Sequence, residues 1–263
     1  DPEKNSVPFD DMLALDRYAV DKARLMQQEI CEAYESYQFH NVVQRLHHYC
    51  VVDLGGFYLD IIKDRQYTMA KDSNGRRSAQ TALYHILHAF VRWMAPIMSF
   101  TAEEIWQYIP GKKEQSVLLT TWYKDLAILP QDEKMGQAYF EKIRAVREAV
   151  NKEIESKRNG GVLGSALEAE VTLFAGPDLK IMLDDLENEL RFVLITASAK
   201  VVPAHAGPVD AVLTEVAGLS LKVEKTTNEK CVRCWHRVPL VGEGLCERCV
   251  TNISETGEVR NYA

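Results

Sequence analysis

The sequence has no long apolar run, no signal-peptide pattern and no surplus of basic residues. No apolar run approaches the about 20 residues that a helix needs to cross a bilayer, and without a leader the cytoplasm is the expected location. The 263 residues carry a net charge of −7. This balance argues against a generally basic nucleic-acid coat, although local patches can still bind RNA.

Signatures of catalysis are also missing. The chain has no phosphate-binding glycine loop, no His-Glu-x-x-His and no nucleophile elbow. His85 and His88 are spaced three apart on a predicted helix and could in principle hold a metal, but the favoured explanation is that both lie on or beside the packed face of the bundle. The chain begins at Asp1 without an initiator Met, which indicates a fragment of a longer protein.

Only six cysteines are present, and four of them form two Cys-x-x-Cys pairs, Cys231 with Cys234 and Cys246 with Cys249. Two such pairs around a short loop are typical of a structural zinc site, because each pair closes a tight turn around one tetrahedral ion. Four thiolates leave no open position for a reactive water, so the one predicted zinc ion is structural. The alternative is a pair of disulfides or unrelated thiols.

Apolar residues at helical spacing predict four helices in the first half of the chain. A polar loop over 63–75 separates the second from the third, Pro96 ends the third, and Thr101 with Glu104 forms a capping box for the fourth. Short connections between such helices favour an antiparallel bundle. The predicted helices cover residues 10–37, 39–62, 76–94 and 101–108.

The pattern changes in the second half, which predicts a small α/β module followed by the zinc segment. Residues 116–123 look extended, and a long charged helix then runs to the glycine turn at 159–161. The expected fold class is therefore mainly α: a helical domain over 1–125, an α/β domain over 126–226 and a zinc module over 227–263. The elements predicted in the second half are a helix at 131–157, strands at 170–174, 191–195 and 219–225, and a helix at 177–190.

Two groups of basic residues are candidates for RNA contact. The run from 63 to 77 has five basic and two acidic residues, 5 − 2 = +3. The second group lies on or beside the cysteine pairs, where an aromatic next to guanidinium groups suits stacking on unpaired bases; packing of Trp235 against the metal-held turn is the alternative. The candidates are Lys63, Arg65, Lys71, Arg76 and Arg77 in the first group, and Lys230, Arg233, Trp235, His236, Arg237 and Arg248 in the second.

Three segments carry a resemblance to one family of enzymes. Residues 230–236 with 246–249 resemble the C-terminal zinc module of bacterial isoleucyl-tRNA synthetases. The run Arg92 to Trp106 is similar to the helical anticodon-binding domain of the class I synthetases for isoleucine, valine, leucine and methionine. Residues 164–174 resemble the junction segment of the isoleucine enzyme, and together these matches cover essentially the whole chain.

The resemblance implies a tRNA-docking region with tRNA(Ile) as partner, monomeric, from an enzyme that activates isoleucine with ATP and transfers it to the tRNA. ATP and isoleucine would bind only to a catalytic domain upstream, so this chain alone should be inactive. Three alternatives remain: the same region of the valine, leucine or methionine enzymes, a zinc finger of the DNA-repair glycosylase type, and a non-enzymatic zinc scaffold.

Overall fold

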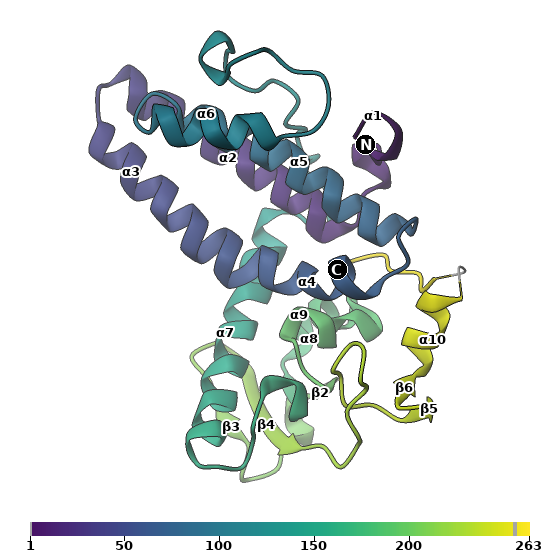
Figure 1. The fold of residues 1–263 in the computed structure, drawn as a ribbon. Coiled ribbons are helices and arrows are strands. Elements are labelled where there is room, and N and C mark those ends of the chain that lie inside the picture. The colour runs from purple at the N-terminus through teal and green to yellow at the C-terminus, as the bar shows by residue number, and fades with distance from the viewer. Residues whose placement is uncertain (1, 255–256) are drawn as a thin grey trace. The chain divides into compact units, whose positions relative to one another are not determined.

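The computed structural model describes residues 2–254 and 257–263, which fall into two compact units (Figure 1). The first, the helical unit, contains residues 2–62 and 71–137, and the second, the α/β unit, contains residues 63–70 and 138–263. The junction and zinc segments, separate domains in the sequence-based division, therefore lie in one unit. That unit also includes the short stretch Lys63–Ala70, which is distant in sequence.

The helical unit is built from antiparallel helices whose apolar faces meet in one core. Trp93 on α5 and Trp106 on α6 are almost wholly buried, and each indole N–H finds an acceptor, the Gln27 side chain and the Glu114 carbonyl respectively. Its elements are α1 (Pro2–Asn5), a 3-10 turn (Phe9–Asp11), α2 (Ala14–Glu35), α3 (Phe39–His48), a π-helical segment (Tyr49–Tyr58), α4 (Leu59–Thr68, shared with the α/β unit), α5 (Asn74–Met94), α6 (Ser99–Tyr108) and a 3-10 turn (Val117–Leu119).

The predicted bundle is confirmed, and its second helix continues through a π-helical segment that contains the glycines at 55 and 56. Two local details differ. Helix α4 extends to Thr68, where a polar loop was predicted. Helix α6 begins at Ser99 without a side-chain cap, and the predicted capping box is wrong; the Glu103 carboxylate instead accepts hydrogen bonds from Ser116 Oγ and the Val117 N–H.

The α/β unit contains a four-stranded mixed sheet in the order β2-β1-β4-β3. Strand β1 pairs in parallel with β2 and antiparallel with β4, so the chain crosses from β1 to β2 through two helices. Its elements are α7 (Gln137–Asn159), a 3-10 turn (Ala166–Glu168), β1 (Ala169–Ala175), α8 (Pro177–Asp184), a 3-10 turn (Glu187–Glu189), α9 (Leu190–Leu194), β2 (Ser198–Pro203), a 3-10 turn (Ala204–Ala206), β3 (Val212–Leu213) and β4 (Leu219–Lys225).

The predicted fold class, mainly helical with a small α/β part, is confirmed, but one strand was misplaced. Residues 191–195 were predicted as a strand and form helix α9 instead, while the strand follows at Ser198–Pro203. An apolar run that is buried on all sides suits a strand or a buried helix equally well. Ile195 ends the helix in the left-handed region, at φ 56°.

The zinc segment closes the described chain with two short strands and a helix. These are β5 (Leu240–Gly242), β6 (Leu245–Cys246) and α10 (Glu247–Ile253), and β5 pairs with β6 in an antiparallel ribbon. Within the described residues, no helix is both long and apolar enough to cross a bilayer.

Candidate metal centre and nucleic-acid interface

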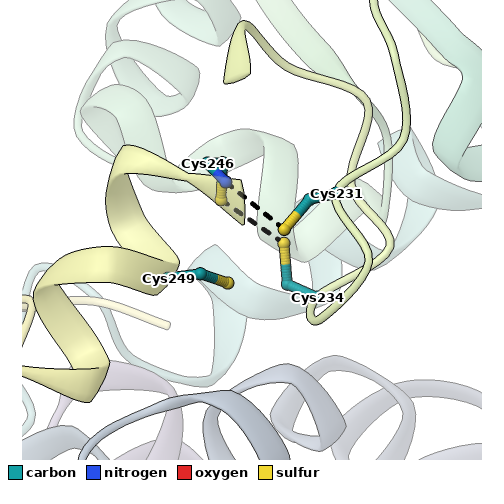
Figure 2. A group of neighbouring side chains, drawn as sticks. All are labelled: Cys231, Cys234, Cys246 and Cys249. Carbon is teal, nitrogen blue, oxygen red and sulfur yellow. Dashed lines mark hydrogen bonds between the residues drawn. The ribbon is translucent and has the colours of Figure 1, made fainter. Parts of the chain in front are cut away.

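The four paired cysteines converge on one point in the α/β unit. Cys231 and Cys234 come from the turn before β5, Cys246 ends β6, and Cys249 lies in the first turn of α10 (Figure 2). Their sulfur atoms all lie within 4.8 Å of one another, and all four side chains are buried. Among the described residues, no other set of three or more His, Cys, Asp or Glu side chains is grouped in this way.

The backbone around the cysteines explains how so short a segment brings them together. The Cys231 N–H donates to the His236 carbonyl at 2.9 Å, and the Trp235 N–H donates to the Cys231 carbonyl at 3.0 Å, which closes the first turn. The Val232 N–H donates to the Gly244 carbonyl and ties this turn to the second. Gly244 has φ +75°, and a Cβ added there would lie 3.1 Å from Val232 Cγ1, so the glycine is required on two counts.

The donor set fits a tetrahedral metal better than disulfides. Cys234 Sγ and Cys246 Sγ are 3.6 Å apart, far beyond the about 2.05 Å of a disulfide. Thiolates about 2.3 Å from a tetrahedral ion lie about 3.8 Å from one another, close to the distance observed. The Cys246 N–H also points at Cys231 Sγ at 3.4 Å. The four-cysteine cluster is therefore consistent with a metal site.

The cysteine thiols differ in how readily they ionise. Burial would raise the pKa of Cys231, but the N–H groups of Cys234, Cys246 and Arg233 outweigh it and lower that pKa to about 6. Burial raises the pKa of Cys249, and the neighbouring Cys234 thiol raises it further. Four thiolates at this separation repel one another, so full ionisation requires a cation among them.

A buried ion-pair network fixes the cysteine cluster to α4. Both Asp64 oxygens accept from Arg248, at 2.5 and 2.7 Å, and Oδ2 also accepts from Arg260 at 2.7 Å. Glu258 accepts from the same two arginines, at 3.1 and 3.3 Å. The Arg260 guanidinium carbon lies 3.3 Å from the centre of the Phe192 ring on α9. The network thus joins α10 and the following chain to α4 and α9.

Two further contacts hold the segment in place. Arg233 Nη1 donates to the Thr68 carbonyl at the end of α4, at 2.6 Å, and approaches Cys249 Sγ at 3.7 Å. The Glu189 carboxylate accepts from three consecutive N–H groups, those of Asn261, Tyr262 and Ala263, at 2.7 to 3.0 Å.

Several of the basic residues predicted to bind RNA face inward instead. Arg65 is fully buried and His236 is 4% exposed, so neither offers a surface to RNA, in contrast with the expectation. Arg248 is held by Asp64 as described, and Arg237 donates to Glu168 at 2.6 Å. Arg237, Arg248 and Arg233 therefore bind other residues of the α/β unit. Arg65 and His236 are buried.

The remaining predicted contacts are exposed or half-buried. Lys63, Lys71, Lys230 and Trp235 are exposed, whereas Arg76 and Arg77 are half-buried, and Arg77 pairs with Asp72 at 2.5 Å. The basic run from 63 to 77 is divided between the two units, since Lys63 and Arg65 belong to the α/β unit and the rest to the helical unit. The first group of candidate RNA contacts therefore has members in both units.

Trp235 is exposed over 60% of its surface, with Lys230 Nζ 4.9 Å from its ring centre. Its backbone has φ +66°, in the left-handed region, where a bulky residue costs roughly 1–2 kcal/mol. An aromatic that only braced the turn would be buried against it. The exposed position and the backbone strain together make Trp235 a candidate contact residue.

Sequence reasoning missed the acidic partners of this site, namely Asp64, Glu168, Glu189 and Glu258, together with Arg260. One signal was available for Asp64: apolar residues continue at helical spacing past Ile62 to Met69, and both are buried. Glu168 and Glu189 carry no comparable signal, because their partners lie far away in the sequence.

The fold and the buried cysteine cluster can now be compared with known proteins. The family model described as the anticodon-binding domain of tRNA ligase matches residues 16–173. The chain belongs to this family of anticodon-binding domains.

Individual relatives are more specific. Isoleucine–tRNA ligases of Stutzerimonas stutzeri (strain A1501) and Pseudomonas aeruginosa (strain LESB58) are each 54% identical to the chain, and that of Azotobacter vinelandii is 55% identical. Each alignment covers 268 residues, 100% of this chain and 28% of the relative. The resemblance to the isoleucine enzyme is confirmed, and the chain spans about 28% of the length of these relatives.

Proposed function

We propose that the chain is the tRNA-docking region of an isoleucine–tRNA ligase. It holds the anticodon stem-loop of tRNA(Ile), while another part of the same ligase activates isoleucine with ATP and transfers it to the 3′ end of the tRNA. The observation that carries this proposal is the combination of the family match over residues 16–173 with identity of 54% or more to isoleucine ligases across the whole chain. Such a role belongs to a monomer in the cytoplasm.

The comparisons weigh against the alternatives. The relatives named above are isoleucine enzymes rather than valine, leucine or methionine enzymes. A repair-glycosylase zinc finger offers no reason for an anticodon-binding match that covers the helical unit and reaches β1.

Zinc is the metal we assign to the four cysteines. Zinc accepts four thiolates in a tetrahedron without any redox change, and such closed sites have a structural role. Cys231, Cys234, Cys246 and Cys249 would hold it. Since the segment after β4 has only short strands and one short helix, metal binding supplies most of the free energy that orders it.

The exposed residues have two different roles in RNA binding. Unpaired anticodon bases stack on aromatic rings and hydrogen-bond at their edges, whereas contacts to phosphates only position the RNA. Trp235 offers the ring, and Lys230 beside it offers a cation. Lys63 and Lys71 are exposed cations suited to phosphate contact. The arginines that face inward hold this surface in place.

Titration of the metal-loaded chain with three RNAs tests the proposal. The RNAs are tRNA(Ile), the same tRNA with a substituted anticodon, and a duplex without a loop. We expect tRNA(Ile) to bind more tightly with decreasing salt. Anticodon substitution should weaken binding by about 5- to 150-fold, the equivalent of one lost base contact at about 1–3 kcal/mol. Equal affinity for all three RNAs would refute anticodon recognition.

A further inference from the structure

One end of the helical unit carries a continuous row of aromatic rings. At the end of α2, Tyr34 lies 6.0 Å from Phe39 and 5.7 Å from Trp122, and Tyr37 lies 6.0 Å from Phe39, all measured between ring centres. Tyr37, Phe39 and Trp122 are exposed over 79%, 48% and 37% of their surfaces. The rings therefore touch one another and also face outward.

An apolar groove continues this row on the other side of Trp122. Its volume is about 480 Å³, and its walls include Pro96, Val117 and Leu118. Arg92 is the only charged residue in the groove wall, and its charge is already engaged. Its guanidinium donates to the His88 carbonyl at 2.6 Å and lies 4.8 Å from the ring centre of Trp106, which is buried.

The start of α6 adds further apolar side chains at this end of the unit. Near the ends of α2 and α5, the Tyr34 hydroxyl donates to the Trp93 carbonyl at 2.7 Å, and Trp122 links this contact to the groove, because it lies against Tyr34 and in the groove wall. Phe100 is 94% exposed, Met98 49% and Leu118 60%. Single exposed apolar residues are ordinary, but a concentration of them at one end of a unit marks an interaction surface.

Charge identifies the kind of partner. Residues 92–122, which include the whole groove wall and α6, contain one arginine, two lysines and three glutamates, a net of 3 − 3 = 0. RNA binding needs a surplus of cations for the phosphates, and this surface has none. A polypeptide with apolar side chains is the complementary partner.

We propose that this apolar end is the surface on which the rest of the ligase packs. The proposal rests on the proposed function, since the isoleucine ligases that match the chain extend well beyond it and the alignment covers 28% of their length. The remaining length is a polypeptide that is tethered to this chain and therefore present at high effective concentration. The end that carries Trp122 and Phe100 thus connects the docking region to the body that performs the chemistry.

Hydroxyl-radical labelling of the full-length ligase tests this proposal. Phe100 and Tyr108 are both on α6 and are 94% and 83% exposed in this chain, so Tyr108 is an internal reference on the same helix. After correction for intrinsic reactivity, we expect the labelling rate of Phe100 to be at least fivefold below that of Tyr108, and Trp122 to be protected as well. Equal rates for Phe100 and Tyr108 would overturn the proposal.

Three further measurements distinguish this proposal from other occupants of the surface and from a failure of the proposed function. Protection that disappears on dilution identifies a second copy, and protection that requires added tRNA identifies RNA; either result overturns the proposal. Isoleucine attachment to tRNA is measured on the same preparation. If that activity is absent while Phe100 is protected, the proposed function fails but the covered surface stands.

Substitutions then assign the contact to named side chains. Phe100→Asp combined with Leu118→Asp in the full-length ligase should raise the labelling rate of Trp122 at least threefold. Both side chains are exposed in this chain, so the change does not disturb its own core. Tyr108→Asp is the matched control on α6 and should leave Trp122 protected. A double variant in which Trp122 remains protected would contradict the assignment.

Discussion

Asp64 holds the cysteine cluster to helix α4, and its replacement by Asn gives a prediction that the structure makes quantitative. The carboxylate bonds Arg248 through both oxygens and Arg260 through one, and these side chains are 15%, 10% and 2% exposed respectively. Asn keeps the size of the side chain but removes the charge, so Glu258 is the one carboxylate side chain of this network that both guanidinium groups still contact. Removal of one partner from a buried ion pair costs about 3–5 kcal/mol.

The expected loss of about 3 kcal/mol corresponds to a fall in Tm of about 6–12 °C for a protein of this size. Calorimetry of the metal-loaded chain measures it, on the transition that also releases the metal. Asp72→Asn is the matched control, because Asp72 pairs with Arg77 at 2.5 Å but is 64% exposed; its loss should stay below about 1 kcal/mol. If the two variants unfold at the same temperature, the network does not anchor the segment.

The pH dependence of the same comparison follows from the pKa of Asp64. Burial would raise this pKa, but the hydrogen bonds and charge of Arg248, with the charge of Arg260, hold it well below its ordinary value. Because the folded pKa is lowered, the stabilisation is complete above the unfolded value of about 3.9 and is lost as the pH falls through the folded value. The difference between wild type and Asp64→Asn should therefore be constant from pH 5 to pH 8.

Three other predictions concern the metal, the exposed tryptophan and a buried histidine. Cys231→Ser or Cys249→Ser should abolish binding of about one zinc ion per chain, as measured by elemental analysis. Cys50→Ser removes an exposed thiol elsewhere and should retain the zinc. A metal content near zero in the unmodified chain would rule out the site. Trp235→Gly relieves the backbone strain of the positive φ, so the unfolding temperature should stay unchanged or rise. Binding of tRNA should weaken by about 5- to 150-fold, because the stacking is lost. Equal losses of stability and binding would assign Trp235 a purely structural role. Burial, with the nearby Arg92 charge, lowers the pKa of His88 to about 4, so stability should fall as the pH drops from about 6.5 towards 4, and His88→Gln should flatten this dependence whereas the exposed His47→Gln should not.

The sequence predicts the helices and the grouping of the four cysteines well because both depend on local spacing. The buried face of α7 and the limits of β4 follow from the periodicity of apolar residues alone. The two-residue spacing within each cysteine pair predicts a tight turn. The misplaced strand at 191–195 failed for a physical reason: α9 is buried on all sides, so its apolar run has no periodicity to read.

The basic residues show the limit of composition more clearly. Arg65 and Arg248 look like surface cations in the sequence, but Arg65 is fully buried. Arg248 is paired with an acidic residue that the fold brings from elsewhere, since Arg248 and Asp64 are 184 positions apart. A count of charged residues along the sequence does not reveal such pairing. Trp235 is the opposite case: its neighbours along the chain predicted a contact role, and its ring is 60% exposed, so the role stays a prediction that the geometry allows.

The central claim is that this chain docks the anticodon stem-loop, and nuclease footprinting of tRNA(Ile) with the metal-loaded chain tests it most directly. The account predicts that the chain protects the anticodon loop and the adjoining stem, leaves the acceptor stem open to cleavage, and loses the loop protection when a chelator removes the metal. Protection centred on the acceptor stem, or loop protection that is indifferent to Trp235→Gly and to metal removal alike, would contradict it.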